Sequence, residues 1–233
     1  MKTEIDRRQL LHLGIMSSIG LLSQGLIRPT SAEAATLTSE DLLTDPDTAL
    51  QALMAGNQRF SQHHPTFPHQ AQSRLQEVSQ AQHPFATILS CADSRVPVEI
   101  LFDQGVGDIF DVRVAGNIVT PEVMGSLEYA IELLETPILM VLGHERCGAV
   151  TAAVQNKPLP GDIGTFVQAI LPAVAASKGQ AGDPVENAVQ QNIKYQLEQL
   201  KRSELITHRL EAGTLKLVGS RYDLDTGKVS IIT

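Results

Sequence analysis

Short apolar runs recur along the chain and predict four strands, at residues 85–91, 108–114, 138–144 and 215–219. The first and third runs are bounded by polar and glycine residues, which is typical of strands buried on both faces. The second run alternates apolar and polar positions, which also indicates a strand. The sequence therefore predicts at least four strands in one sheet.

Helical periodicity fills the intervals between these runs. A helix is predicted over residues 44–60, where Asp45 or Asp47 can cap the amino end and Pro46 suits the first turn. Further helices are predicted at residues 121–134, from 147 onward, 164–177 and 186–202. The alternation of strands and helices predicts an α/β fold, a mainly parallel β-sheet flanked by helices with an N-terminal helical arm.

Composition narrows the class of protein. The chain has 233 residues with 42% hydrophobic content, enough for one domain with a sizeable core, which we assign to residues 35–233. Lys+Arg 18 against Asp+Glu 26 gives a net charge of −8. This charge argues against nucleic acid or an anionic membrane surface as a partner.

Residues 1–34 read as an export signal. Arg7-Arg8 precede an apolar run, residues 10–27, which ends in the small-residue pattern Ala32-Glu33-Ala34. The paired arginines resemble the twin-arginine type, so we expect export to the periplasm and no stable membrane insertion after signal removal. The alternatives are an ordinary amphipathic helix and an uncleaved anchor, although Gly and Ser residues thin the apolar run.

The two cysteines of the chain follow predicted strands. Cys91 ends the first strand, His144 ends the third, and Cys147 follows it. Ligands bind at the carboxyl ends of strands in an open parallel sheet. Two thiols and an imidazole at that edge match the three protein ligands of a catalytic zinc, with a fourth position left for water. We therefore predict one Zn²⁺ per chain.

Simpler interpretations of these residues remain open. Two cysteines in an exported protein are often a disulfide, and a histidine at a strand end is often a core residue. A disulfide would need neither His144 nor the Asp93 and Arg95 that follow Cys91. The Asp/Arg pair could be an ordinary surface ion pair, but its place beside a candidate ligand favours a role at the site. The histidines His63, His64 and His69 could form a second metal site, although their Pro- and Gln-rich surroundings favour a solvated loop.

From about residue 49 to its end, the chain resembles the β-class carbonic anhydrases. The resemblance rests on Cys91-Ala92-Asp93-Ser94-Arg95 and His144-Glu145-Arg146-Cys147-Gly148, and on Gly107-Asp108-Ile109-Phe110, Arg113-Val114-Ala115-Gly116-Asn117, Ser126-Leu127-Glu128-Tyr129-Ala130 and Tyr222-Asp223-Leu224-Asp225-Thr226-Gly227. It implies zinc-dependent reversible hydration of CO2 to bicarbonate and a proton, by attack of zinc-bound hydroxide. In the family, Arg95 would hold Asp93 off the metal, and Asp93 would accept a hydrogen bond from that hydroxide.

The resemblance also implies a substrate pocket. Gln82 matches a glutamine that presents its amide to substrate in plant-like relatives, Phe110 an apolar wall, and Tyr129 a pocket tyrosine. Ala115 stands where such relatives often carry a larger aliphatic residue. In the family these walls are completed across an interface, which implies a homodimer or a higher even oligomer, and N-terminal helices lie across the partner.

The family divides into an open type and a closed type. In the closed type the Asp, here Asp93, swings in as a fourth ligand, and bicarbonate occupies a pocket with a Trp three residues before the first Cys ligand. That position is Ile88 here, and the chain has no Trp. Gln82 is a marker of the open type, so we expect the open state. The alternative functions are a CS2 or COS hydrolase on the same fold, or a non-catalytic zinc-binding protein.

Overall fold

The computed structural model describes residues 39–233, and the predicted export signal lies outside the described residues. The strands are β1 (Ala86–Ser90), β2 (Ile109–Arg113), β3 (Ile138–His144), β4 (Lys216–Tyr222) and β5 (Val229–Ile231). The helices are α1 (Ser39–Thr44), α2 (Pro46–Ser61), α3 (Gln72–Val78), α4 (Val98–Leu101), α5 (Pro121–Glu132), α6 (Gly148–Gln155), α7 (Ile163–Ser177), α8 (Pro184–Leu200) and α9 (Glu204–Glu211), with a short 3-10 turn η2 (Ala115–Asn117). None of the helices in this part of the chain has the length and apolarity needed to cross a membrane.

The five strands form one sheet in the order β2-β1-β3-β4-β5. The first four strands run parallel, and β5 pairs antiparallel with the end of β4. The mainly parallel α/β sheet is therefore confirmed. The predicted last strand is longer than expected, and the sequence prediction missed β5, which has only three residues.

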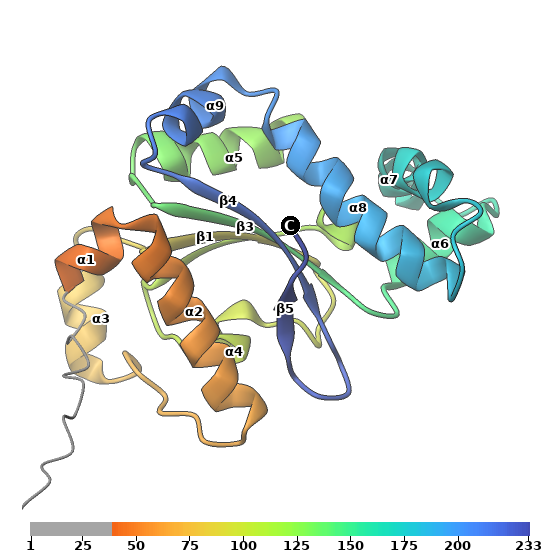
Figure 1. Cartoon of the computed structure of the whole chain (residues 1–233). Helices are drawn as coiled ribbons and strands as arrows, with labels where there is room; N and C mark the ends of the chain where they lie inside the picture. Colours follow the sequence, from red (N-terminus) through yellow and green to blue (C-terminus); the bar gives the residue numbers. More distant parts are fainter. Residues whose placement is uncertain (1–38) are drawn as a thin grey trace, which may run out of the picture. The chain divides into compact units, whose positions relative to one another are not determined.

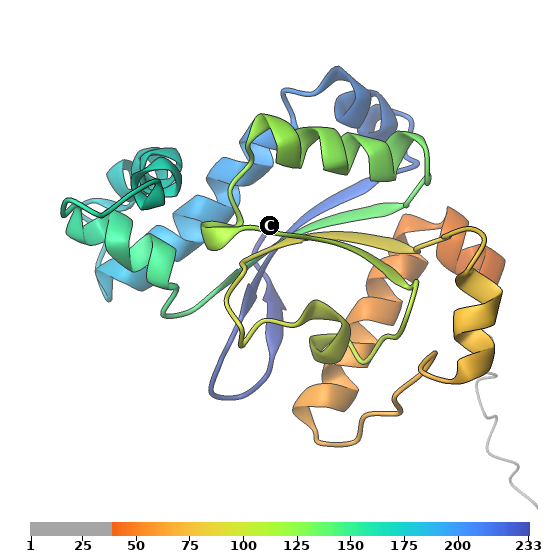
Figure 2. The same ribbon diagram turned by 180° about the vertical axis from the view of Figure 1, so that it is seen from behind.

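Helices cover both faces of the sheet (Figures 1 and 2). On one face lie α5, α8 and α9, and on the other lie α1, α2 and α4. Because side chains alternate along a strand, β3 serves two cores: Leu139 and Val141 belong to one, and Ile138, Met140 and Leu142 to the other. Every residue of β1 and β3 is buried, as their apolar runs predicted.

The predicted N-terminal helix is α2. Asp45 caps it by accepting a hydrogen bond from the Thr48 amide at 2.9 Å, and Pro46 occupies its first turn. A Cβ at Gly56 would lie 1.7 Å from the Phe102 carbonyl oxygen, so only glycine allows this close approach to α4. Helix α2 therefore packs on its own chain, and contact of the N-terminal arm with a partner stays a prediction.

The other predicted helices are present with shifted ends. Helices α5, α6, α7 and α8 correspond to the four helical stretches predicted after residue 120. Helices α1, α3, α4 and α9 were not predicted from the sequence. Helix α4 has four residues and α3 buries none of its side chains, so neither shows the apolar periodicity of a longer helix.

Candidate metal centre

The first candidate ligand follows β1, a strand near the middle of the sheet. Cys91 is 4% exposed and comes directly after Ser90, the last residue of the strand. The Ala92 amide donates to the Val114 carbonyl at 3.3 Å, so the chain continues alongside the segment after β2. The sheet therefore delivers the thiol at its carboxyl edge, where the sequence placed it.

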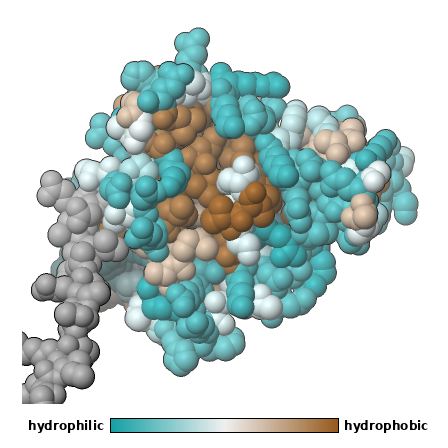
Figure 3. Space-filling view, viewed as in Figure 1, coloured by the Kyte–Doolittle hydropathy of each residue, from teal (hydrophilic) through white to brown (hydrophobic). Residues whose placement is uncertain are grey.

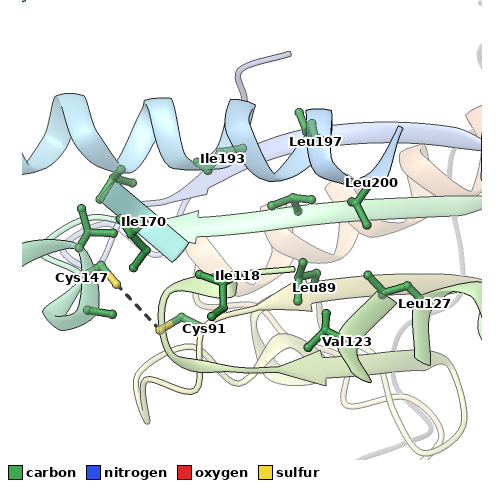
Figure 4. Close-up of a cluster of buried hydrophobic side chains, with 14 of the residues drawn as sticks. Leu89, Cys91, Ile118, Val123, Leu127, Cys147, Ile170, Ile193, Leu197 and Leu200 are labelled. Atoms are coloured by element: carbon green, nitrogen blue, oxygen red, sulfur yellow. Dashed lines mark hydrogen bonds between the residues drawn. The ribbon is translucent and has the colours of Figure 1, made fainter. Parts of the chain in front are cut away.

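The other two ligands come from the end of neighbouring β3. His144 is the last residue of the strand, and Cys147 precedes α6 as its N-cap. Arg146 between them has a φ of 50°, and this left-handed residue turns the chain so that Cys147 faces Cys91. The two sulfurs lie 3.9 Å apart (Figure 4), and both cysteines are free. The ligand atoms of Cys91, His144 and Cys147 all lie within 4.8 Å of one another.

The histidine presents one particular nitrogen to this group. His144 Nδ1 lies 3.0 Å from the Glu145 carbonyl oxygen, and because a carbonyl only accepts, Nδ1 carries the proton. Nε2 is then the acceptor, and it is buried without a hydrogen-bond partner among the described residues. A buried acceptor without a partner is costly, and a metal ion would satisfy it.

The two thiols influence each other directly. Hydrogen bonding between them is the main cause that lowers the pKa of Cys91 and raises the pKa of Cys147. The Gly116 amide also donates to Cys91 Sγ at 3.3 Å, which favours the thiolate. The pair therefore readily loses one proton, and a bound cation would take the place of the second. The donor set of two sulfurs and one neutral imidazole fits zinc.

Asp93 and Arg95 form a tight pair beside this group. Arg95 donates from Nε and Nη2 to the two carboxylate oxygens at 2.9 and 2.8 Å, and its own amide donates to Oδ1 at 3.0 Å. The Arg95 side chain lowers the pKa of Asp93 to about 2. Asp93 Oδ2 lies 3.9 Å from His144 Nε2. The carboxylate is thus ionised, held by two parallel hydrogen bonds and next to the candidate ligands.

Arg113, at the end of β2, holds the loop that carries Cys91 and Asp93. Its Nε donates to the Cys91 carbonyl at 3.2 Å, and its Nη2 donates to the Asp93 carbonyl at 2.6 Å. In the sequence Arg113 belongs to the motif of residues 113–117, but no role for it was predicted. Its contact with both carbonyls depends on the pairing of β1 with β2.

A second set of contacts holds the loop between His144 and Cys147. The Glu145 carboxylate accepts hydrogen bonds from the Leu224 amide at 2.8 Å and from Arg221 Nη2 at 3.0 Å. Arg146 forms a two-bond ion pair with Asp225, at 2.7 and 2.9 Å. These contacts fasten the loop to the end of β4 and to the turn between β4 and β5, and none of them was predicted from the sequence.

The predicted pocket residues are not gathered at the metal group of one chain. Ala115 is the first residue of the η2 turn, and the amide of the next residue, Gly116, donates to Cys91 Sγ. Phe110 and Tyr129 contact each other, with ring centroids 6.1 Å apart. Phe110 pairs with Thr87 of β1, however, and Thr87 lies four residues, or about 13 Å, before Cys91 along the chain. Gln82 is exposed on the loop before β1, at the opposite end of that strand from the metal group. These roles stay predictions that need a second chain.

The histidines of the 63–69 loop do not converge. Within residues 39–233, no group of potential metal ligands includes them. His69 Nδ1 instead pairs with Asp108 at 2.7 Å. A second possible group, Glu145, Asp223 and Asp225, is already paired with Arg146 and Arg221.

The fold and the site define a class: an α/β protein with a buried Cys–His–Cys group at the carboxyl edge of a parallel sheet. A family model described as carbonic anhydrase matches residues 86–229. The chain belongs to this family, in its β class, as the resemblance implied. It is therefore an enzyme that hydrates CO2 reversibly to bicarbonate, and the β-class carbonic anhydrases are zinc enzymes.

Relatives match along most of their length. Carbonic anhydrase 2 of Mycobacterium tuberculosis is 39% identical over 190 residues, which cover 79% of this chain and 92% of the relative. The carbonic anhydrase of Mycolicibacterium smegmatis is 39% identical over 193 residues, which cover 81% and 94%. The solved structure of the β-carbonic anhydrase CcaA has a TM-score of 0.64 and 29% identity, covering 79% of this chain and 95% of that chain.

Proposed function

We propose that this chain hydrates CO2 at one zinc ion held by Cys91 Sγ, His144 Nε2 and Cys147 Sγ. The observation that carries the proposal is the convergence of these three buried atoms within 4.8 Å, with Nε2 lacking any other partner. When bound, zinc supplies the Lewis acidity that makes water a nucleophile near neutral pH. No contact among residues 39–233 favours CS2 or COS as the substrate.

Asp93 orients the attacking water in this proposal. Its pKa of about 2 keeps the carboxylate ionised at neutral pH, so its oxygens accept hydrogen bonds and cannot donate one. Arg95 holds both oxygens, which prevents the carboxylate from turning toward the metal. Asp93 Oδ2 therefore accepts a hydrogen bond from the water and directs the water's lone pair toward CO2.

The same contacts support an open resting state, with Asp93 off the metal. A swing of Asp93 would break two charge-assisted hydrogen bonds to Arg95. Ile88, at the position of the regulatory Trp of closed-type relatives, is fully buried in an apolar cluster. An Ile side chain gives bicarbonate no hydrogen-bond donor, and burying an anion without a partner is costly.

X-ray absorption at the zinc edge tests the ligand set. Protein containing one zinc per chain should show two sulfurs at ~2.3 Å, one nitrogen at ~2.0 Å and one light atom that is exchangeable. Cys91→Ser and Cys147→Ser should each lose most of their zinc, and any zinc that remains should show only one sulfur. A shell with fewer than two sulfurs in the unmutated protein would contradict the assignment, as would a disulfide between the two cysteines in freshly isolated active protein.

The substrate pocket is proposed to be completed by a second copy of the chain. Strand β2 is an edge strand, and beside it Tyr129 and Leu133 are 43% and 71% exposed on one side of α5. Gln82 and Phe110 belong to the same end of the sheet. An even oligomer that pairs these surfaces would carry the three pocket residues toward the partner's metal.

A further apolar surface supports assembly beyond a pair. Figure 3 shows apolar side chains gathered in the centre of the face seen in Figure 1, where β4 and β5 form the other edge of the sheet. Ile231 of β5 is 43% exposed. A solved relative from Sordaria macrospora, 21% identical with a TM-score of 0.65, is described as tetrameric.

Leu133→Glu tests the shared pocket. The charge should break the interface, so the variant should be monomeric by sedimentation and should lose activity at full zinc content. The control is Leu205→Glu on α9, since Leu205 is 45% exposed and lies away from β2; this variant should keep both its assembly and its activity. A fully active Leu133→Glu monomer would contradict the shared pocket.

We further propose that residues 1–34 direct export to the periplasm. The support is the sequence pattern of Arg7-Arg8, the apolar run and Ala32-Glu33-Ala34. Export in the folded state would let the thiolate site bind zinc before it meets an oxidising compartment.

A further inference from the structure

The turn that follows β2 has an unusual backbone. Gly116 and Asn117 have φ values of 76° and 45°, so two successive residues are left-handed. The φ of Gly116 favours glycine, and a Cβ there would also lie 2.6 Å from Ile170 Cδ1, so the end of the Ile170 side chain would have to move. An L-residue such as Asn117 in this region costs about 1–3 kcal/mol, so the surrounding structure must hold the turn.

This turn contacts a candidate zinc ligand. The Gly116 amide points at Cys91 Sγ, with a nitrogen–sulfur distance of 3.3 Å. A hydrogen bond to a metal thiolate reduces the negative charge that the sulfur donates and fixes the direction of its lone pairs. The geometry of the turn therefore bears on both zinc affinity and zinc acidity.

Two buried amides of α8 hold the turn in place. Asn192 Nδ2 donates to the Gly116 carbonyl at 2.8 Å, and Gln196 Oε1 accepts from the Val119 amide at 2.9 Å. Gln196 Nε2 then donates to Asn192 Oδ1 at 2.9 Å, and both side chains are 1% exposed. Reversing either amide would set two oxygens or two nitrogens against each other, so the network permits one arrangement.

We propose that Asn192 and Gln196 are positioning residues for the metal centre: they fix the 116–119 turn so that the Gly116 amide keeps its hydrogen bond to Cys91 Sγ. Their hydrogen bonds go to the backbone of the turn and to each other, so they act on Cys91 through the turn. This inference rests on the proposed zinc site. A purely structural role would give the two amides a share of the folding free energy and nothing more.

The experiment compares zinc-loaded wild-type protein with Asn192→Ala and Gln196→Met. Thr136→Val is the control, because Thr136 is also buried, at 0% exposed, and its hydroxyl bonds to Thr87 and to the Ala130 carbonyl at the opposite end of β1 and β3 from the metal group. Three quantities are measured: the unfolding temperature, the rate of zinc transfer to a chromogenic chelator, and the thiolate-to-metal charge-transfer band of the cobalt-substituted protein.

We expect all three variants to unfold at lower temperature than the wild type. Only Asn192→Ala and Gln196→Met should transfer zinc about 10-fold faster and shift the charge-transfer band. Thr136→Val should match the wild type in both. Gln196→Met keeps the side-chain volume, so it carries the test if Asn192→Ala does not fold.

Two results would overturn the inference. One is that the two α8 variants keep the wild-type charge-transfer band and transfer zinc at a rate within twofold of the wild type. The other is equal acceleration in Thr136→Val, which would indicate general loosening of the fold. A wild-type protein that binds no zinc would contradict the proposed function itself, so the two failures can be told apart.

Discussion

Arg113 is the residue outside the proposed ligand set whose removal should damage the site most. Its guanidinium donates to the Cys91 and Asp93 carbonyls and so connects the loop to β2. In Arg113→Ala both bonds are lost and the loop is held mainly by its own turn. Arg113→Lys can replace one of the two bonds, because an ammonium group is a compact donor without the two-armed geometry.

The size of the effect follows from the contacts. A hydrogen bond from a charged group contributes about 1.5–3 kcal/mol. The Arg113 side chain is 32% exposed, so water replaces part of the hydrogen bonding that the two carbonyls lose. We expect Arg113→Ala to cost about 2 kcal/mol in total. If this cost falls on ordering the loop for reaction, kcat/KM should drop about 30-fold, with Arg113→Lys about 5-fold below wild type.

Stopped-flow CO2 hydration with zinc quantified in each sample is the assay. The unfolding temperature of Arg113→Ala should fall by about 4–8 °C for a domain of this size. Arg59→Ala is the control: the Arg59 side chain is 35% exposed and holds a different loop, donating to the Asp103 carboxylate at 2.5 Å and to its carbonyl at 3.3 Å. It should lose similar stability and keep kcat/KM. Activity of Arg113→Ala within twofold of wild type at full zinc content would refute the reasoning.

Four shorter predictions concern the metal, its neighbours and export. Cys147→Ser should lose zinc and unfold at lower temperature, measured by metal analysis and calorimetry, because site formation is coupled to folding. Since the folded pKa of Asp93 is lowered to about 2, the stability that its ion pair contributes should be present above pH ~4 and lost only as the pH falls toward ~2. Asp93 therefore stays ionised across pH ~7–8.5, and activity in that range should follow a simple titration of the attacking water. Bicarbonate should inhibit with a Hill coefficient near one, because Ile88 offers it no donor; steep cooperativity would count against this. Replacement of Arg7-Arg8 by Lys-Lys should block export, and intact-mass analysis of the natural protein should find about 34 residues removed.

The strand ends that carry the ligands could be predicted from the sequence. Strands β1 and β3 are buried on both faces, so their apolar runs stand out, and the residues that interrupt those runs are Cys91 and His144. Parallel pairing of neighbouring strands then brings the two residues to one edge. This part of the site is local in sequence, which is why spacing and residue type were enough.

The residues that support the ligands could not be predicted in the same way. Asn192 and Gln196 are polar positions on a helix, and such positions usually face solvent, yet both are buried against the 116–119 turn. Arg113 and Glu145 act through backbone groups that strand pairing and the β4–β5 turn bring near. These contacts join segments far apart in the chain, so no local pattern records them.

The substrate pocket could be predicted only through the family resemblance. Gln82, Phe110 and Tyr129 came from the resemblance, and one chain leaves them away from its own metal group. Their role depends on how two surfaces pair, which is decided by the shape and charge of an interface and has no periodicity along the chain.

The most direct test of the central claim is CO2 hydration measured as a function of zinc occupancy in the isolated wild-type protein. The initial rate, corrected for buffer, should rise in proportion to zinc from none to one ion per chain and then level off. It should vanish on chelation and return when zinc is restored. No turnover above buffer at one zinc per chain would contradict the account.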